Sequence, residues 1–107
     1  MDSTKNEDFG LSAENKMRIQ SILKNYLRIK PSYQIYVFGS RANGTQQKYS
    51  DIDLWIEATP SVTKDDIFEL SRLFADSELT IKVDIVSTET CLAEYKSRII
   101  SERKFWF

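Results

Sequence analysis

Two aspartates separated by one residue, Asp51 and Asp53, are the side chains whose type and spacing first suggest chemistry. They lie at the start of the apolar run Ile52–Ile56, which is typical of a strand. Because alternate residues of a strand share a face, both carboxylates project from one side and the isoleucines from the other. Two like charges held this close are costly unless a cation lies between them, and hard divalent cations prefer oxygen ligands. The spacing therefore predicts a metal site at the start of this strand.

A third carboxylate, Asp84, lies in the one later run that resembles a strand, Ile81–Val86. The odd positions of that run are apolar, so Asp84 projects from the opposite face. If both strands bury their apolar faces against the same helices, Asp51, Asp53 and Asp84 share the exposed face. We expect these three aspartates to be the catalytic residues and the metal ligands.

The pair Gly39–Ser40 follows an apolar strand and should open a short helix, Ser40–Asn43. Backbone N–H groups at the start of a helix bind phosphate oxygens well, and glycine lets a ligand approach the backbone closely. Ser40 can donate a hydroxyl hydrogen bond, and Arg41 and Lys48 add positive charge nearby. These four residues are therefore expected to bind the phosphates of a nucleotide beside the metal. The combination fits metal-assisted phosphoryl or nucleotidyl transfer.

Together these residues resemble the signature of the nucleotidyltransferases related to DNA polymerase beta. The resemblance rests on Gly39–Ser40, Gly44 and Ser50–Leu54, and it extends from about Ile35 to Val86. More narrowly, the chain is similar to the minimal nucleotidyltransferases, the MNT proteins, whose members include antitoxins paired with HEPN-domain toxins. In that family the glycine-serine pair binds the nucleoside triphosphate, and two paired aspartates with a third on a later strand hold two magnesium ions. By position, these residues are Gly39, Ser40, Asp51, Asp53 and Asp84.

The resemblance implies a magnesium-dependent nucleotidyltransferase that moves a nucleoside monophosphate, AMP from ATP, to an acceptor hydroxyl. The acceptor would lie on a partner HEPN toxin, and this chain would act as its antitoxin. Three alternatives stay open at this point. The chain could modify a small molecule such as an aminoglycoside, neutralise its toxin by occlusion without catalysis, or bind a nucleotide as a regulator without turnover.

The overall composition narrows the choice of partner and compartment. A chain of 107 residues, 41% hydrophobic and 29% charged, is expected to form one domain over residues 1–107. Its net charge of −1 gives no strong signal for nucleic-acid binding. The lack of histidine excludes a Ser-His-Asp triad, and the single cysteine excludes an internal disulfide. No apolar run approaches membrane-spanning length, so we expect no membrane association and a cytoplasmic location.

The elements that must position these residues alternate between helices and strands. Apolar periodicity and caps predict helices over about 12–29, from a cap at Thr63 to about 76–78, and from a cap at Ser87 or Thr88 to about 102. Strands are expected over 33–38, 51–57 and 80–86. The expected fold class is α/β of the α+β kind, a small mixed sheet with helices packed on one face and the other face open to metal and nucleotide. Residues 1–10 are polar and acidic and are expected to be disordered.

Two aromatic features leave alternatives open. Trp55 shares the face of the aspartates, where it could stack on a nucleotide base or fill space beside the site, and filling is slightly favoured. The run Phe105–Phe107 brings three aromatic residues together, and these are costly to expose to water. They either fold back onto the core or form an interface, with a second copy in a homodimer or with a partner protein.

Overall fold

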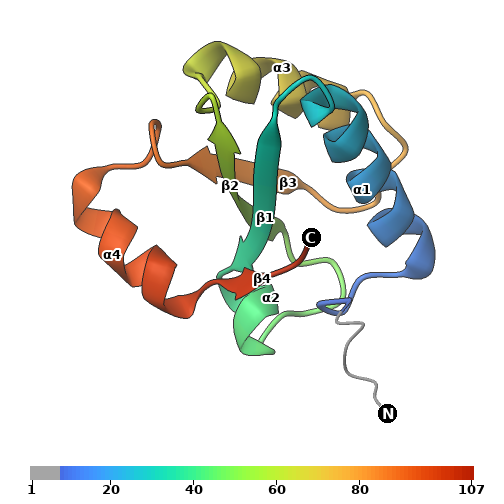
Figure 1. Cartoon of the computed structure of the whole chain (residues 1–107). Coiled ribbons are helices and arrows are strands. Elements are labelled where there is room, and N and C mark those ends of the chain that lie inside the picture. Colours follow the sequence, from blue (N-terminus) through green and yellow to red (C-terminus); the bar gives the residue numbers. More distant parts are fainter. Residues whose placement is uncertain (1–7) are drawn as a thin grey trace.

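Eight helices and strands follow one another in the computed structural model, which describes residues 8–107 (Figure 1). In chain order they are α1 (Ala13–Leu27), β1 (Ser32–Phe38), α2 (Ser40–Asn43), β2 (Ile52–Thr59), α3 (Lys64–Ala75), β3 (Val83–Ser87), α4 (Ala93–Glu102) and β4 (Lys104–Phe105). Disorder was predicted for residues 1–10. Residues 1–7 lie outside the described residues, and residues 8–10 do not fit the prediction. Phe9 is 6% exposed, and its carbonyl accepts a 2.8 Å hydrogen bond from Arg41.

The sheet has four strands in the order β3-β2-β1-β4. β1 runs antiparallel to both β2 and β4, whereas β2 and β3 are parallel. Helix α3 connects the two parallel strands, as a crossover between parallel neighbours requires. The predicted mixed sheet of an α+β fold is confirmed, and β4 is an edge strand that the sequence pattern did not predict.

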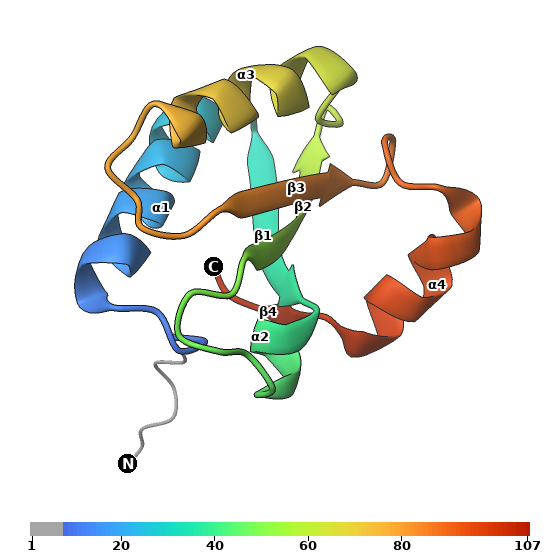
Figure 2. The same cartoon turned by 180° about the vertical axis from the view of Figure 1, so that it is seen from behind.

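The core lies between one face of the sheet and the helices α1 and α3, which run side by side (Figures 1 and 2). Alternate residues of the strands point into it, as the period of two requires. Its most deeply buried side chains include Ile19, Leu23, Leu27, Ile35, Val37, Ile52, Leu54, Ile56 and Leu70. The apolar faces predicted for the first helix and for the two central strands are therefore the buried ones.

The N-terminus of α3 is the capping box that the sequence predicts. The Thr63 side chain accepts a hydrogen bond from the backbone N–H of Asp66, and the Asp66 carboxylate accepts one from the backbone N–H of Thr63. Asp66 also accepts a 2.9 Å hydrogen bond from the hydroxyl of Tyr26 on α1. One carboxylate therefore fixes both the start of α3 and its position against α1.

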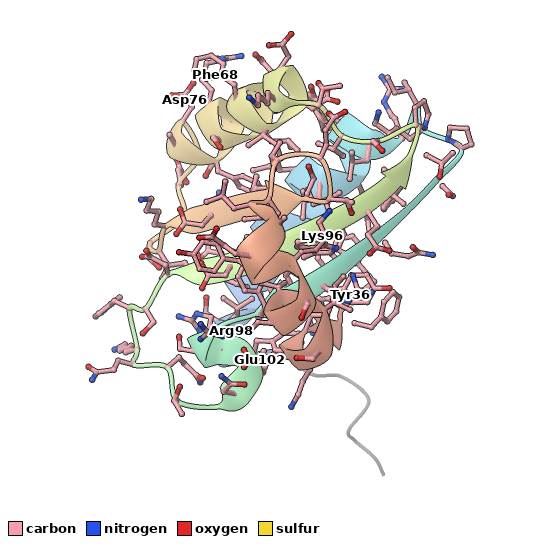
Figure 3. All side chains as sticks on the ribbon, turned by 90° about the vertical axis from the view of Figure 1, so that its left-hand side faces the viewer. Tyr36, Phe68, Asp76, Lys96, Arg98 and Glu102 are labelled. Carbon is pink, nitrogen blue, oxygen red and sulfur yellow. The ribbon has the colours of Figure 1, made fainter. Side chains whose placement is uncertain are left out.

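Helix α4 differs from the other helices because none of its residues is buried. It lies in front of the sheet in Figure 3, on the face opposite α1 and α3. The prediction that this helix begins at a cap on Ser87 or Thr88 is wrong. The hydroxyl of Thr90 accepts a 3.0 Å hydrogen bond from the backbone N–H of Ser87, which forms a turn, and the helix begins only at Ala93.

Neither α4 nor any other described helix is long and apolar enough to cross a membrane.

The aromatic tail folds back onto the molecule. β4 pairs Phe105 with Tyr36 of β1, and the two rings meet edge to face with their centres 5.7 Å apart. Trp106 meets the ring of Phe9 in the same way at 5.9 Å, and Phe107 is also packed against the core. The fold-back interpretation therefore holds for the last two residues, while Phe105 is 60% exposed.

Candidate active site

The turn between β1 and α2 has a backbone conformation that favours glycine at its first position. Gly39 has φ +76° and ψ −154°, a combination that residues with a side chain rarely adopt. A Cβ atom at this position would also overlap Oδ2 of Asp53. The N–H groups of Ala42 and Asn43 each donate a 3.1 Å hydrogen bond to the Gly39 carbonyl, which closes the single turn of α2. The predicted helix Ser40–Asn43 is confirmed, and its start lies against a carboxylate of β2.

The strand register brings this turn together with two of the three predicted aspartates. Phe38 pairs with Asp53 across β1 and β2, and Asp53 pairs with Asp84 across β2 and β3. Because directly paired residues of neighbouring strands project from the same face, the two carboxylates lie side by side. Asp51 lies in the loop just before β2 and is exposed. Parity in the sequence implied a shared face, and the structure adds that β2 and β3 are neighbours.

Asp53 lies in an environment that is short of positive charge. Burial raises its pKa above the ordinary aspartate value, and the negative charges of Asp84 and Asp51 raise that pKa further. Just before β3, the ammonium of Lys82 lies 3.6 Å from Oδ1 of Asp84. A set of carboxylate oxygens with this excess of negative charge suits a hard divalent cation such as Mg²⁺.

The aspartates do not form a closed metal site by themselves. Among residues 8–107, no group of three or more acidic, histidine or cysteine side chains is drawn together closely enough to hold a metal ion. The arrangement is a close pair, Asp53 and Asp84, with Asp51 contributing charge from the adjoining loop. These residues fit a cation that takes its remaining oxygen ligands from a bound phosphate, as Mg²⁺ commonly does.

Arg41, which was predicted to bind the nucleotide, lies inside the protein and bonds to backbone carbonyls there. Arg41 is 3% exposed, and its guanidinium donates 2.8 Å hydrogen bonds to the backbone carbonyls of Phe9 and Ser50. Burial lowers its pKa, although the nearby charge of Asp51 acts in the opposite sense. Arg41 therefore ties α2 to the loop ahead of Asp51. The sequence could not distinguish these roles, because an arginine beside a phosphate turn suits either one.

The other predicted phosphate ligands remain accessible. Gly39 and Ser40 are partly exposed, and Lys48 is exposed. The ammonium of Lys48 lies 5.4 Å from the centre of the Tyr49 ring, on the loop that leads to Asp51. A ligand on the carboxylate side of the sheet can therefore reach the turn and the loop from solvent.

Trp55 shares the face of the aspartates but is fully buried, so its interpretation as a space-filling residue is confirmed. Its indole N–H donates a 3.1 Å hydrogen bond to Glu57, which also accepts a 2.6 Å hydrogen bond from Arg103. The Arg103 guanidinium lies 3.8 Å from the centre of the Tyr36 ring. These contacts attach the C-terminal end of α4 to the sheet and leave no face of Trp55 free for a base.

A hollow of about 240 Å³ separates α4 from the Gly39 turn. Its lining residues are Phe38, Gly39, Tyr95, Arg98, Ile99 and Glu102. Those on α4 recur every three or four positions and so share one face of the helix. From the sequence, this helix was expected to pack with the others on one face of the sheet, and for that reason these residues were missed as part of the site.

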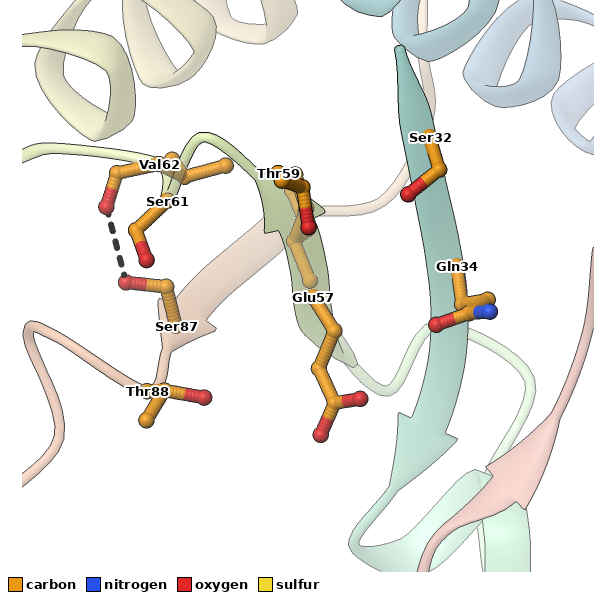
Figure 4. Close-up of a pocket in the computed structure, with 10 residues that line it drawn as sticks. Ser32, Gln34, Glu57, Thr59, Ser61, Val62, Ser87 and Thr88 are labelled. Carbon is orange, nitrogen blue, oxygen red and sulfur yellow. Dashed lines mark hydrogen bonds between the residues drawn. The ribbon is translucent and has the colours of Figure 1, made fainter. Parts of the chain in front are cut away.

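A second hollow, of about 260 Å³, lies at the opposite end of the sheet (Figure 4). It is lined mainly by polar side chains, among them Ser32, Gln34, Glu57, Thr59, Ser61, Ser87 and Thr88. The hydroxyl of Ser87 donates a 3.3 Å hydrogen bond to the carbonyl of Val62. Because β2 begins beside Asp51 and ends at Thr59, this hollow is separated from the aspartates by the length of that strand.

The glycine-serine turn lies beside aspartates of neighbouring strands, on a mixed sheet that two helices cover. This combination defines a nucleotidyltransferase. Residues 17–107 match the family described as Polymerase beta, Nucleotidyltransferase, and the chain belongs to this family. It is 32% identical over 83 residues to a protein of Haemophilus influenzae named probable protein adenylyltransferase MntA, an alignment that covers 74% of this chain and 70% of that protein. The predicted resemblance to the MNT proteins is thereby confirmed.

Solved structures show the same likeness. One is a toxin-antitoxin complex with AMP-PNP, in which one chain has a TM-score of 0.64 and 28% identity over 82% of this chain and 72% of that one. Another is a tri-AMPylated Shewanella oneidensis HEPN toxin in complex with an MNT antitoxin, with a TM-score of 0.63 and 23% identity over 88% of this chain and 70% of the matched chain. The second match shows the fold alone.

Proposed function

We propose that this chain transfers AMP from ATP to a hydroxyl group of a HEPN toxin and acts as the antitoxin of that partner. The observation that carries the proposal is the strand register, which sets Asp53 beside Asp84 and next to the Gly39 turn. The Haemophilus influenzae relative is named as a protein adenylyltransferase, which supports a protein acceptor. The related toxin-antitoxin complex contains AMP-PNP, an analogue of ATP, which supports the choice of nucleotide.

The two sides of the site have separate tasks in this proposal. Backbone N–H groups at Gly39–Ser40 and the ammonium of Lys48 hold the triphosphate. Asp51, Asp53 and Asp84 would hold magnesium, two ions by the family resemblance, and bound Mg²⁺ neutralises phosphate charge and acidifies the acceptor hydroxyl. The side chain of Asp84 is 41% exposed, so it is accessible to an acceptor that arrives from solvent.

The partner toxin is proposed to complete the site from the side of α4. This helix has no buried residue, and the apolar side chains of its N-cap residue Leu92 and of Ile100 are 62% and 44% exposed. Exposed apolar side chains gathered on one element are typical of a protein interface. A toxin docked on this helix would present its hydroxyl on the face that carries Asp53 and Asp84.

Transfer of label from ATP tests the catalytic part of the proposal. The protein is incubated with Mg²⁺, a HEPN toxin and ATP radiolabelled at its α-phosphate, and the label on the toxin is followed with time. Asp53→Asn and Asp84→Asn are each expected to slow labelling by about a hundredfold or more. Each substitution removes a negatively charged carboxylate that would hold Mg²⁺ beside the phosphates. Asp76→Asn is the matched control, since Asp76 is an exposed carboxylate at the C-terminal end of α3 (Figure 3) and the rate should not change.

Neutralisation of the toxin in cells separates catalysis from occlusion. The double variant Asp51→Ala/Asp53→Ala should fail to neutralise a toxin that the wild type inactivates. Full neutralisation by this variant would contradict the catalytic proposal and support an antitoxin that acts by binding. Label found on an aminoglycoside, or retained by this chain without transfer, would contradict the proposed acceptor.

A further inference from the structure

The hollow between α4 and the Gly39 turn is continuous with the proposed phosphate site. Gly39 is one of its lining residues, so a ligand anchored on the turn can extend directly into the hollow. Its volume of about 240 Å³ is smaller than the roughly 300–1,000 Å³ of pockets that enclose drug-sized molecules. This size suits a single ring system better than a whole nucleotide.

The walls of the hollow combine flat apolar surfaces with a polar rim. Phe38 from β1 and Tyr95 from α4 supply aromatic rings, and Ile99 lies one helical turn beyond Tyr95. Tyr95 is 49% exposed, so a second ring can still gain contact with it by stacking. Arg98 and Glu102, whose Nε and Oε2 atoms are 3.6 Å apart, offer a donor and an acceptor at the α2 end of the sheet (Figure 3). A nucleobase has matching features, namely two flat faces and a polar edge.

The wall formed by α4 is held in place although none of its residues is buried. Arg103 follows the helix directly, and its guanidinium donates a 2.6 Å hydrogen bond to Glu57 and covers the ring of Tyr36. The side chain of Arg103 is 16% exposed, so this ion pair is largely shielded from water. Arg103 is therefore a positioning residue that keeps α4 at a set place opposite the Gly39 turn, and a preformed wall lowers the cost of binding.

We propose that this hollow binds the base of the nucleotide whose triphosphate lies on the Gly39–Ser40 turn, with Tyr95 as the stacking partner. The inference rests on the proposed function, because it takes the ligand on the turn to be a nucleoside triphosphate. The continuity of turn and hollow, the aromatic walls and the small volume favour the base over a side chain of the protein acceptor. Tyr95 is then a base-binding residue on a helix that carries none of the family motif.

Comparison of ATP with inorganic tripolyphosphate separates the contribution of the nucleoside from that of the phosphates. Both ligands are titrated with Mg²⁺ present by isothermal titration calorimetry, and tripolyphosphate has the phosphates but neither ribose nor base. Tyr95→Ala is expected to weaken ATP binding about tenfold and to leave tripolyphosphate binding unchanged. Tyr95→Phe keeps the ring and should bind ATP as the wild type does. Phe68→Ala removes another exposed aromatic ring, on α3 (Figure 3), and should change neither affinity.

Each result assigns the hollow differently. Equal ATP affinity of the wild type and Tyr95→Ala would overturn the inference and leave the proposed function intact. Failure of the wild type to bind either ligand would contradict the proposed function itself. Weaker toxin binding by Tyr95→Ala with unchanged ATP affinity would assign the hollow to the protein acceptor, which also overturns the inference. Because Tyr95 is not buried, the variant is expected to fold, and a thermal melt without ligand checks this.

Discussion

At the scale of single residues, the site depends on the close approach of Gly39 to Asp53. The glycine has no side chain, so an oxygen of Asp53 occupies the space where a Cβ would lie. The same glycine adopts the positive φ that starts α2 against the end of β1. A substitution at this position therefore disturbs the phosphate side and the metal side of the site together.

Gly39→Ala is expected to lower the free energy of unfolding by roughly 2–3 kcal/mol and to slow AMP transfer at least tenfold. The positive φ alone costs about 1–2 kcal/mol for a residue with a Cβ, and the new atom must displace Asp53. Gly44→Ala is the control for a positive φ, since its φ is also +76°, but its ψ of 17° lies in the left-handed helical region and nothing lies within 4 Å of the added Cβ. It should cost only about 1 kcal/mol. Urea denaturation and label transfer measure both effects, and equal losses in the two variants would rule out a special role for the Asp53 contact.

At the scale of elements, the crossover helix α3 sets β3 beside β2 and so decides where Asp84 lies. The position of α3 against α1 depends on Asp66. Burial on its own would raise the pKa of Asp66, but hydrogen bonds from Thr63 and Tyr26 and the charge of Lys30 hold that pKa below the ordinary aspartate value. A carboxylate whose pKa is lower in the folded state than in the unfolded state stabilises the protein fully at pH values above its unfolded-state pKa. This contribution is lost as the pH falls through the folded-state pKa.

Tyr26→Phe is expected to reduce the free energy of unfolding by about 1 kcal/mol near neutral pH. The difference from the wild type should shrink below about pH 4, where Asp66 begins to take up a proton. Burial and the bond to Asp66 raise the pKa of Tyr26 to about 12, so the phenol remains a donor over this range. Denaturation curves between about pH 3 and pH 7 measure the effect, with the exposed Tyr49→Phe as the control. A difference that is independent of pH would show that the charge of Asp66 is not involved.

At the scale of the whole molecule, the two ends of the described chain meet and support the loop before the aspartates. Trp106 packs against Phe9, and the carbonyl of Phe9 accepts a hydrogen bond from Arg41, which in turn holds the carbonyl of Ser50. The backbone of Trp106 also donates a 2.8 Å hydrogen bond to the carbonyl of Ile35 in β1. Residues far apart in the sequence therefore stabilise the same side of the site.

Trp106→Ala is expected to lower the free energy of unfolding by roughly 2–3 kcal/mol, because it removes an aromatic side chain that is partly buried between the core and Phe9. Phe105→Ala removes the neighbouring ring, which is 60% exposed, and should cost less than about 1 kcal/mol. Chemical denaturation of the two variants gives the comparison directly. Equal destabilisation would mean that the tail adds no specific packing at Trp106.

The features that the sequence by itself determined are those set by neighbours a few residues away. The glycine-serine turn, the helix Ser40–Asn43 and the Thr63 capping box depend on local backbone geometry, and each was predicted at its position. The alternation along β2 also identified Ile52–Ile56 as the run with a buried face and placed Asp53 on the opposite one.

Only the tertiary structure decided which segments meet. Hydrophobic periodicity shows that a face is covered but not what covers it. Helix α4 was therefore expected on the same face of the sheet as the other helices, whereas it lines a hollow beside Gly39 on the opposite face. The pairing of β2 with β3, which sets Asp84 beside Asp53, depends on a crossover that no short-range pattern encodes. Arg41 was expected at the phosphates, and it is instead buried because carbonyl groups from distant segments converge on its guanidinium.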